Sequence, residues 1–452
     1  MRDIILTAVV AGLLPFCLAA PWVGVLVWSW IGYMNPHRLA WGFATQAPFA
    51  LAVAVATLIG MPFAKDRKPI PWERETCLLL ALWIMFTIST FYSLYPAVAW
   101  PQWERVSKIF LFTFITLKFF QDRERLRYLF VLIAFAIGFY GVKGFVFTIS
   151  TGGQYLVYGP ERSFLSSNNS VGLALNMVLP FLYLLPRDEP RPWLRRVMIG
   201  SFWTSAVAVI FTYSRGAFLG LAVVMTLLFM KGSKRLVSGV ATVLAAVIFF
   251  LTVGSSLIPE RWWIRMGTIS AYEEDRSAMG RLEAWGIAYQ IALERPLVGG
   301  GFWVLPQPDI RARFDSPRNL SAHSIYFSIL GDHGFVALGL YVGLLVSCLW
   351  TLASLRRTVG RRPEGAWLVN PAKMIETSLI AYMVSGAFQT EAYFDLFYHL
   401  VAAVVLLKVL AARTAPAVEP SAVPAEPAPA PAITTRRRPL LQPRLGTGEA
   451  RQ

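Results

Sequence analysis

Apolar runs long enough to span a membrane recur along this chain, with short polar segments between them. They cover residues 4–34, 43–63, 76–93, 105–119, 128–149, 169–186, 195–212, 215–230, 236–257, 323–353, 374–389 and 394–412. A helix needs about 20 apolar residues to cross the hydrocarbon core of a bilayer. Pro15 and Pro21 interrupt the first run, which predicts either one kinked span or a helical hairpin. The pattern predicts an all-α integral membrane protein with about 12 transmembrane helices.

The polar loops differ in charge, and this difference predicts the orientation of the chain. Lysine and arginine are concentrated in five loops, at residues 65–74, 122–127, 187–196, 231–235 and 356–373. Two apolar runs separate each of these loops from the next, so all five fall on one face. Short cytoplasmic loops carry an excess of lysine and arginine. We therefore expect this face to be cytoplasmic, and we expect both termini to lie on it.

One long loop dominates the opposite face. Residues 257–322 form a connection far longer than those common between helices, and its segment 277–294 has the pattern of an amphipathic helix. The other segments on this face are 92–104, 150–168, 212–215 and 389–392. Residues 413–452 are rich in proline and alanine, which predicts a disordered cytoplasmic tail.

Composition narrows the function classes. Hydrophobic residues make up 56% of the chain and charged residues 15%, whereas about 25% charged is usual for soluble domains. The net charge of +16 is explained by topology and by contact with membrane lipids, so no nucleic-acid partner is expected. Cys17, Cys77 and Cys348 lie in or beside apolar runs without metal-ligand spacing. The acidic run at residues 273–275 fits a solvated loop, and we expect neither a metal nor another cofactor.

Several arginines fall on the face where cations are not expected. They include Arg162, Arg215, Arg265 and Arg281. Arg215 is flanked by apolar runs in a very short turn, and an ionisable residue at membrane depth is a functional candidate. The alternative is an arginine that anchors a helix end at the interface. The guanidinium fork makes paired, charge-assisted bonds to phosphate, so a cluster of arginines here favours a lipid-linked diphosphate as ligand.

His323 is the candidate proton acceptor. It stands where the long loop meets the next apolar run, and an unperturbed imidazole titrates near pH 6.5. It could accept a proton from a sugar hydroxyl; the alternative is a helix-terminal histidine with one hydrogen bond. Glu283 and Asp332 are the competing carboxylates, and His333 fits a structural role better.

Four motifs in this order resemble the O-antigen ligase and polymerase superfamily of bacterial membrane glycosyltransferases. They are Arg162 before Asn168 and Asn169, the stretch from Tyr213 to Gly216, the run from Gly280 through Trp285 and Pro296 to Gly301, and His323 at the start of a span. The family usually has asparagine after the histidine, and here the residue is Ser324. The opening stretch Gly32–Arg38 is similar to a subgroup described as O-glycosylation ligases.

The resemblance implies a metal-independent transferase with a GT-C-like fold in the bacterial inner membrane and a periplasmic active site. Its donor would be a glycan on undecaprenyl diphosphate, and its acceptor lipid A-core, which would make it an O-antigen ligase. A protein O-glycosylation ligase, an O-antigen polymerase and a flippase of lipid-linked sugars remain alternatives. The implied catalytic residues are His323 and Arg215, and the implied substrate-binding residues are Arg162, Asn169, Tyr213, Arg265 and Arg281.

The implied domain organisation has three parts. Residues 1–127 would form N-terminal transmembrane helices, residues 128–412 the ligase-like core with the periplasmic loop 257–322, and residues 413–452 the tail.

Overall fold

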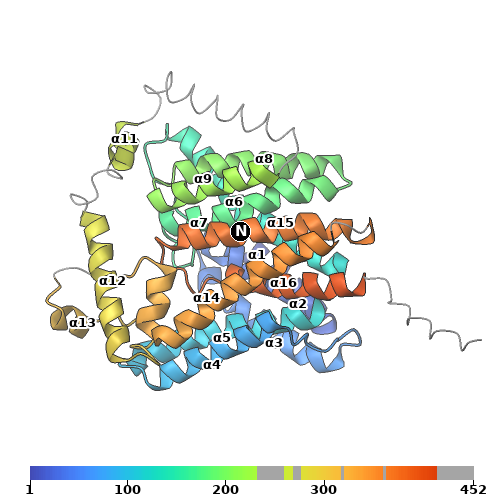
Figure 1. The fold of residues 1–452 in the computed structure, drawn as a ribbon. Helices are drawn as coiled ribbons and strands as arrows, with labels where there is room; N and C mark the ends of the chain where they lie inside the picture. The colour runs from blue at the N-terminus through green and yellow to red at the C-terminus, as the bar shows by residue number, and fades with distance from the viewer. Residues whose placement is uncertain (232–258, 268–275, 317–319, 360–362, 415–452) are drawn as a thin grey trace, which may run out of the picture. The chain divides into compact units, whose positions relative to one another are not determined.

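A computed structural model describes residues 1–231, 259–267, 276–316, 320–359 and 363–414. Within these residues the chain is helical, and the helices follow the apolar runs. They are α1 (Arg2–Ala19), α2 (Pro21–Met34), α3 (Phe49–Gly60), α4 (Arg74–Phe91), α5 (Pro96–Phe119), α6 (Arg123–Ser150), α7 (Asn168–Leu184), α8 (Pro192–Ile210), α9 (Arg215–Lys231), α11 (Glu260–Gly267), α12 (Arg276–Glu294), α13 (Pro308–Arg313), α14 (Ile325–Val359), α15 (Val369–Gly386) and α16 (Asp395–Arg413) (Figure 1). The expected span 236–257 and the tail from residue 415 lie outside the described residues.

Length and hydropathy support a membrane protein. Six of the described helices are long and apolar enough to cross a membrane. A helical membrane protein is therefore confirmed, whereas the count of about 12 spans stays a prediction. The proposed boundary at residue 127 also stays a prediction.

The first apolar run forms two helices. Ala20, in an extended conformation, separates α1 from α2, and Pro21 begins α2 at a position where its missing N–H costs nothing. Helices α1, α2 and α3 pack together as one group. At one end of this group, Asp3 Oδ1 accepts hydrogen bonds from the backbone N–H groups of Gly42 (3.0 Å) and Ala44 (3.1 Å). At the other end, a Cβ added to Gly60 would lie 2.0 Å from the carbonyl oxygen of Leu18.

These contacts also locate the N-terminus within the α1–α3 group. They place it at the end of the α1–α3 group that is remote from Gly60. The C-terminal end of α16 lies on the Gly60 side, because Arg413 donates to the carbonyl oxygen of Gln121 (2.9 Å) and the Gln121 amide donates to Pro69 (2.7 Å). The break at Ala20 divides the first apolar run into two helices, and the prediction that both termini are cytoplasmic stays a prediction.

Helix α5 begins earlier than the apolar pattern predicts. The segment 92–104 was expected to be a loop, but the helix starts at Pro96 and contains Pro101 in its second turn. Two indole groups join it to α4: Trp83 Nε1 donates to Ser107 Oγ and Trp103 Nε1 donates to Thr87 Oγ1, both at 2.9 Å. Pro96 occupies the first position of the helix, where its missing N–H costs nothing.

The five cation-rich loops meet at one end of the helices, which we call the basic end. Shared carboxylates connect them. Glu376 binds Lys231 (2.8 Å) and Arg356 (2.9 Å), and Glu189 binds both Arg127 and Arg191. Further links are Arg125 with Asp66, Asn370 with Asp188, and Lys408 with Glu73. The predicted grouping of these loops on one face agrees with these contacts.

The orientation of the basic end is testable with single cysteines in a cysteine-free background. Because short basic loops stay in the cytoplasm, a cysteine at position 191 should resist a membrane-impermeant maleimide added to intact spheroplasts. A cysteine at position 161 should react, because Glu161 is exposed and precedes α7, at the end of that helix remote from the basic end. Labelling at position 191 but not at position 161 would show that the protein has the opposite orientation in the membrane.

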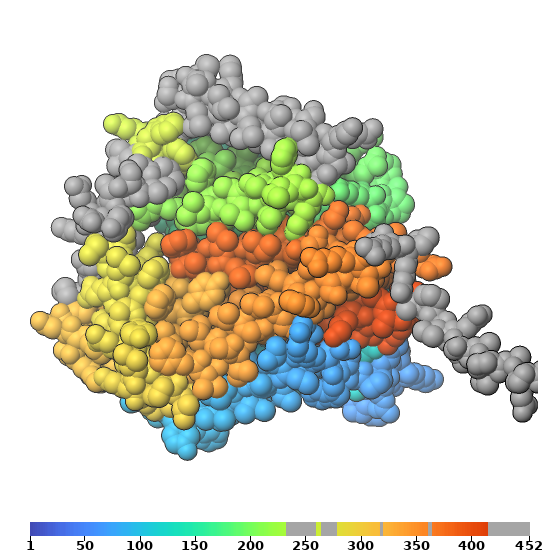
Figure 2. Space-filling model, in the orientation of Figure 1, coloured from blue at the N-terminus to red at the C-terminus, as the bar shows by residue number. Residues whose placement is uncertain are grey.

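Helix α12 packs across α14, as Figures 1 and 2 show by the yellow helix lying against the orange one. The predicted amphipathic helix 277–294 is confirmed, with Ile287 and Ile291 buried. The segment Gly299–Gly301, which follows α12, then turns back onto α14. A Cβ at Gly299 would lie 2.6 Å from the backbone nitrogen of His333, and one at Gly334 would lie 2.5 Å from the carbonyl oxygen of Pro296. Gly334 kinks α14 at this contact with φ 79°, so glycine is needed on both sides.

Candidate functional site

A cavity of about 480 Å³ opens at the end of the helices opposite the basic end. We call it the polar cavity. Five segments form its walls: the start of α5, residues 162–170, residues 303–306, residues 321–332 and the turn 389–393 between α15 and α16. The lining side chains that carry charge or titrate are Arg105, Arg162, His323, Asp332, Glu391 and Tyr393. Cations, carboxylates and one imidazole therefore share a single cavity.

The segment that carries Arg162 is a compact turn before α7. Ser163 Oγ donates to the carbonyl oxygen of Pro160 (2.7 Å) and accepts from the backbone N–H of Leu165 (3.1 Å). Ser167 then caps α7 by accepting from the backbone N–H of Ser170 at 2.9 Å. These contacts fix the backbone on both sides of Arg162, whose side chain is exposed at the cavity rim.

Arg105 joins this turn to α5. Its guanidinium lies over the ring of Phe164, 3.8 Å from the ring centre. Such a cation–π contact holds the guanidinium plane. Arg105 and Arg162 both line the cavity, which gives it two positive charges that suit an anion.

His323 is held by α12. Trp285 on that helix donates from Nε1 to the carbonyl oxygen of Ala322 (2.6 Å) and stacks on Phe327 with ring centres 4.9 Å apart. Burial lowers the pKa of the His323 imidazole below its ordinary value, and the positive charge of Arg281 on α12 lowers it further. The imidazole is therefore neutral near pH 7, which is the form able to accept a proton.

A buried hydrogen-bonded chain stands behind the cavity wall. Tyr393 donates from its hydroxyl to Asp332 Oδ2 (2.8 Å), and the same hydroxyl lies 2.8 Å from His333 Nε2. His333 Nδ1 contacts Ser89 Oγ on α4. His333 has no exposed surface and stacks on Phe86. These hydrogen bonds hold Asp332 in the cavity wall, and the buried position of His333 agrees with a structural role for that residue.

Several residues at this end adopt a backbone conformation unusual for side chains with a Cβ. Arg162 (φ 55°), Trp303 (φ 59°) and His323 (φ 40°) line the cavity in the left-handed region, and Tyr213 (φ 56°) lies nearby in the same conformation. Left-handed non-glycine residues cluster at functional sites, where the surrounding structure holds them. The strain supports the cavity as the candidate site.

The structure brings some of the predicted site residues to the cavity and not others. His323, Arg162 and Asn169 line it. Arg281 lies within electrostatic range of His323. Glu283, the competing carboxylate, accepts a hydrogen bond from Ser316 and is not among the lining residues.

The motif from Tyr213 to Gly216 lies next to the cavity wall. The Tyr213 hydroxyl donates to the carbonyl oxygen of Gly153 at 2.6 Å, and neither Tyr213 nor Arg215 lines the cavity. Arg215 begins α9, and the next residue, Gly216, packs against Phe388 beside the 389–393 turn. The side chain of Arg265 in α11 lies outside the described part of the structure.

Among the polar lining residues to which the sequence argument gave no role are Arg105, Gln389 and Glu391. Arg105 was placed at the start of an apolar run, although a cation there meets the criterion that singled out Arg215. Glu391 is a carboxylate in a short turn between two apolar runs, which is the same kind of signal.

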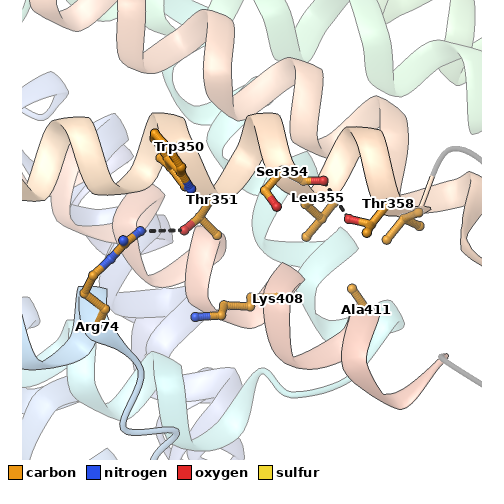
Figure 3. Close-up of a pocket in the computed structure, with 9 residues that line it drawn as sticks. Arg74, Trp350, Thr351, Ser354, Leu355, Thr358, Lys408 and Ala411 are labelled. Atoms are coloured by element: carbon orange, nitrogen blue, oxygen red, sulfur yellow. Dashed lines mark hydrogen bonds between the residues drawn. The ribbon is translucent and has the colours of Figure 1, made fainter. Parts of the chain in front are cut away.

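A second cavity, of about 370 Å³, lies at the basic end between α4, α14 and α16. Figure 3 shows Arg74 directed at Thr351 and Lys408 lying below them. Arg74 is already paired with Glu75 (3.0 Å) and Lys408 with Glu73 (2.7 Å). These pairs give the cavity a structural explanation, and we do not assign chemistry to it.

No metal site is apparent in the part of the chain that the structure describes, where no three His, Cys, Asp or Glu side chains are grouped to bind an ion. Metal-independent chemistry stays a prediction of the sequence.

The fold and the cavity together define a helical membrane protein with an arginine-, carboxylate- and histidine-lined site at one end of its helices. Residues 200–342 match a family described as O-antigen ligase, and residues 1–178 match a family of unknown function. No curated protein matches the chain. The segment 200–342 is thus a domain of the O-antigen ligase and polymerase superfamily, and the predicted resemblance is confirmed.

The two matched segments meet at the polar cavity. Arg105, Arg162 and Asn169 come from the first segment, and His323 and Asp332 from the second, whereas Glu391 follows both. The site therefore takes residues from both matched segments and from the turn that follows them, and is not contained in either match.

Proposed function

We propose that this protein is an O-antigen ligase, which transfers a glycan from undecaprenyl diphosphate to lipid A-core at the periplasmic face of the bacterial inner membrane. The observation that carries the proposal is that Arg105 and Arg162 line one cavity with His323, which belongs to the ligase-family domain. Arginines suit the diphosphate, and a neutral imidazole suits a hydroxyl acceptor.

The proposed reaction is a direct displacement at the anomeric carbon of the donor glycan. The bond from that carbon to the diphosphate oxygen breaks, and the electron pair leaves with the diphosphate. The acceptor oxygen forms the new bond and its proton passes to the His323 imidazole. Arg105 and Arg162 stabilise the charge that develops on the leaving group. The positive charges of Arg215 and Arg281, beside the cavity, would add to the stabilisation of the leaving diphosphate.

Mass spectrometry of the acceptor tests the proposed function. Purified protein with an undecaprenyl diphosphate-linked glycan should add the glycan to lipid A-core, and the product should gain its mass. The reaction should persist in EDTA, because the arginines take the role that a metal ion has in other transferases. A gain of mass on a peptide hydroxyl, or on a second lipid-linked repeat, would identify a protein ligase or a polymerase. Loss of transfer in EDTA with rescue by Mg²⁺ would contradict metal independence.

A further inference from the structure

The cavity at the basic end, which we call the basic-end cavity, lies between α4, α14 and α16. It holds about 370 Å³, and the described residues that line it include two cations and no carboxylate. Arg74 begins α4, and Lys408 lies near the end of α16. The other lining residues belong to α14 and α16, and they are Trp350, Thr351, Ser354, Leu355, Thr358, Val359 and Ala411. The lining therefore carries two positive charges.

Ion pairs engage only part of each cation. Arg74 donates from Nε to Ser347 Oγ (2.7 Å) and from Nη2 to Glu75 (3.0 Å), whereas its Nη1 has no acceptor among the described protein atoms. Lys408 pairs with Glu73 at 2.7 Å, which uses one of the three N–H groups of the ammonium. The side chains of the two cations are 53% and 39% exposed. Figure 3 shows Lys408 directed toward the side of the cavity on which Arg74 lies, so both cations have donors open to one shared ligand.

The rest of the lining is amphipathic. Ser354 and Thr358 carry hydroxyl groups one turn apart on α14, Leu355 and Val359 supply an apolar wall, and the Trp350 side chain is largely exposed. Tryptophan is enriched where hydrocarbon meets water, and basic pockets between transmembrane helices bind the headgroups of anionic lipids. A free phosphate ion would use the cations but not the indole or the apolar wall. The lining therefore favours a phosphate that carries acyl chains.

We propose that the basic-end cavity binds the phosphate of an anionic phospholipid from the adjacent leaflet. Arg74 Nη1 and the Lys408 ammonium donate to the phosphate oxygens, and the acyl chains leave the cavity beside Trp350. The bound lipid connects α4, α14 and α16. The basic-end cavity lies at the opposite end of the helices from the polar cavity, so this proposal goes beyond the proposed function and does not depend on it.

Titration of lipid into delipidated, detergent-solubilised protein tests the site, with native mass spectrometry counting the bound lipids. Wild type should bind one phosphatidylglycerol about 10-fold more tightly than phosphatidylcholine with the same acyl chains, because the choline group carries a positive charge that the two cations repel. Lys408→Gln should weaken the binding of phosphatidylglycerol roughly 10-fold, the factor expected for one hydrogen bond between charged groups. Its binding of phosphatidylcholine should change little.

Two control variants separate the cavity from other roles of the same charges. Glu73→Gln breaks the same ion pair but keeps the lysine, so it should bind phosphatidylglycerol at least as tightly as wild type. A merely structural ion pair predicts an equal loss in Glu73→Gln and Lys408→Gln. Both variants should fold, because the pair is partly exposed and such pairs contribute little to stability. Lys65→Gln removes an exposed cation of the basic end that does not line the cavity, and it should bind as wild type does.

The outcomes that would overturn the proposal are distinct. Equal binding of the two lipids by wild type, or an unchanged affinity for phosphatidylglycerol in Lys408→Gln, would exclude a site for an anionic headgroup. An equal loss in Lys408→Gln and Lys65→Gln would show attraction to the basic end as a whole. Inorganic phosphate that displaces phosphatidylglycerol at an equal concentration would assign the cavity to a free anion. None of these measurements uses glycan transfer, so each outcome leaves the proposed function as it stands.

Discussion

Replacing His323 with asparagine should lower turnover by about 10²–10⁴-fold, the usual contribution of a general base, while donor binding is retained. Asparagine is the informative substitute because His323 has φ 40°, and asparagine tolerates the left-handed region better than most residues. The variant therefore keeps the local backbone but loses a group that accepts a proton. The measurement is the single-turnover rate with saturating donor and acceptor.

His37→Asn is the matched control, since His37 lies in the turn between α2 and α3 and does not line the polar cavity. A His323→Asn protein within a few-fold of wild type would exclude the base role.

The pH dependence of the wild type offers a second criterion for the same assignment. Burial and Arg281 both lower the pKa of His323, so activity should fall only at a pH below the ordinary imidazole value of about 6.5. Removing the Arg281 charge should raise that pKa and move the acid limb to higher pH. Burial raises the pKa of Glu391 to about 7. An acid limb near pH 7 that is unmoved by Arg281→Ala would assign the base to Glu391 instead.

Replacing Arg105 or Arg162 with alanine should reduce the rate of the chemical step by about 10²–10³-fold, as expected for one group that stabilises a developing anion. Lysine at either position should restore little, because it keeps the charge but lacks the planar fork. Arg105 is the sharper case, since its guanidinium is already oriented by Phe164. Thermal unfolding of each purified variant shows whether the fold is intact.

Lys108→Ala is the control for the arginine variants. Lys108 lies one turn further along α5, where it pairs with Glu104 at 2.5 Å on the exposed surface, and exposed pairs contribute little to stability. Activity near the wild-type level in Arg105→Lys and Arg162→Lys would contradict a bidentate role for the pair. The same comparison at Arg215 would decide whether that arginine contacts the diphosphate or anchors the start of α9.

The helices that the sequence predicted well are those whose apolar runs begin and end abruptly. Helices α4 and α9 start within about two residues of the expected position, a margin common to any assignment of helix ends. The start of α5 was missed because Pro96, Pro101 and Glu104 read as a loop, although proline is tolerated in the first turn of a helix. The sequence left open whether the first apolar run forms one kinked helix or two helices, because either Pro15 or Pro21 could have marked a break. In the structure Pro15 lies inside α1 and the break is at Ala20.

Of the predicted site residues, Arg162 and His323 line the cavity; they were singled out because cations are not expected on the predicted periplasmic face and because the chain has few histidines. Gln389 and Glu391 were missed because the sequence does not show that the 389–393 turn packs beside the start of α7 and lines the same cavity. The left-handed conformation of Arg162 has no sequence signature, since arginine does not favour that region.

Helix α16 follows every other described helix in the chain, yet it lies among the most deeply enclosed. In its most apolar window 78% of the residues are buried, and its far end binds Gln121 and Glu73 through Arg413 and Lys408. During synthesis, therefore, α4, α5, α14 and α15 are made before the helix that packs against all four of them. Their packing is completed only when α16 has been made, together with the 389–393 turn that lines the polar cavity.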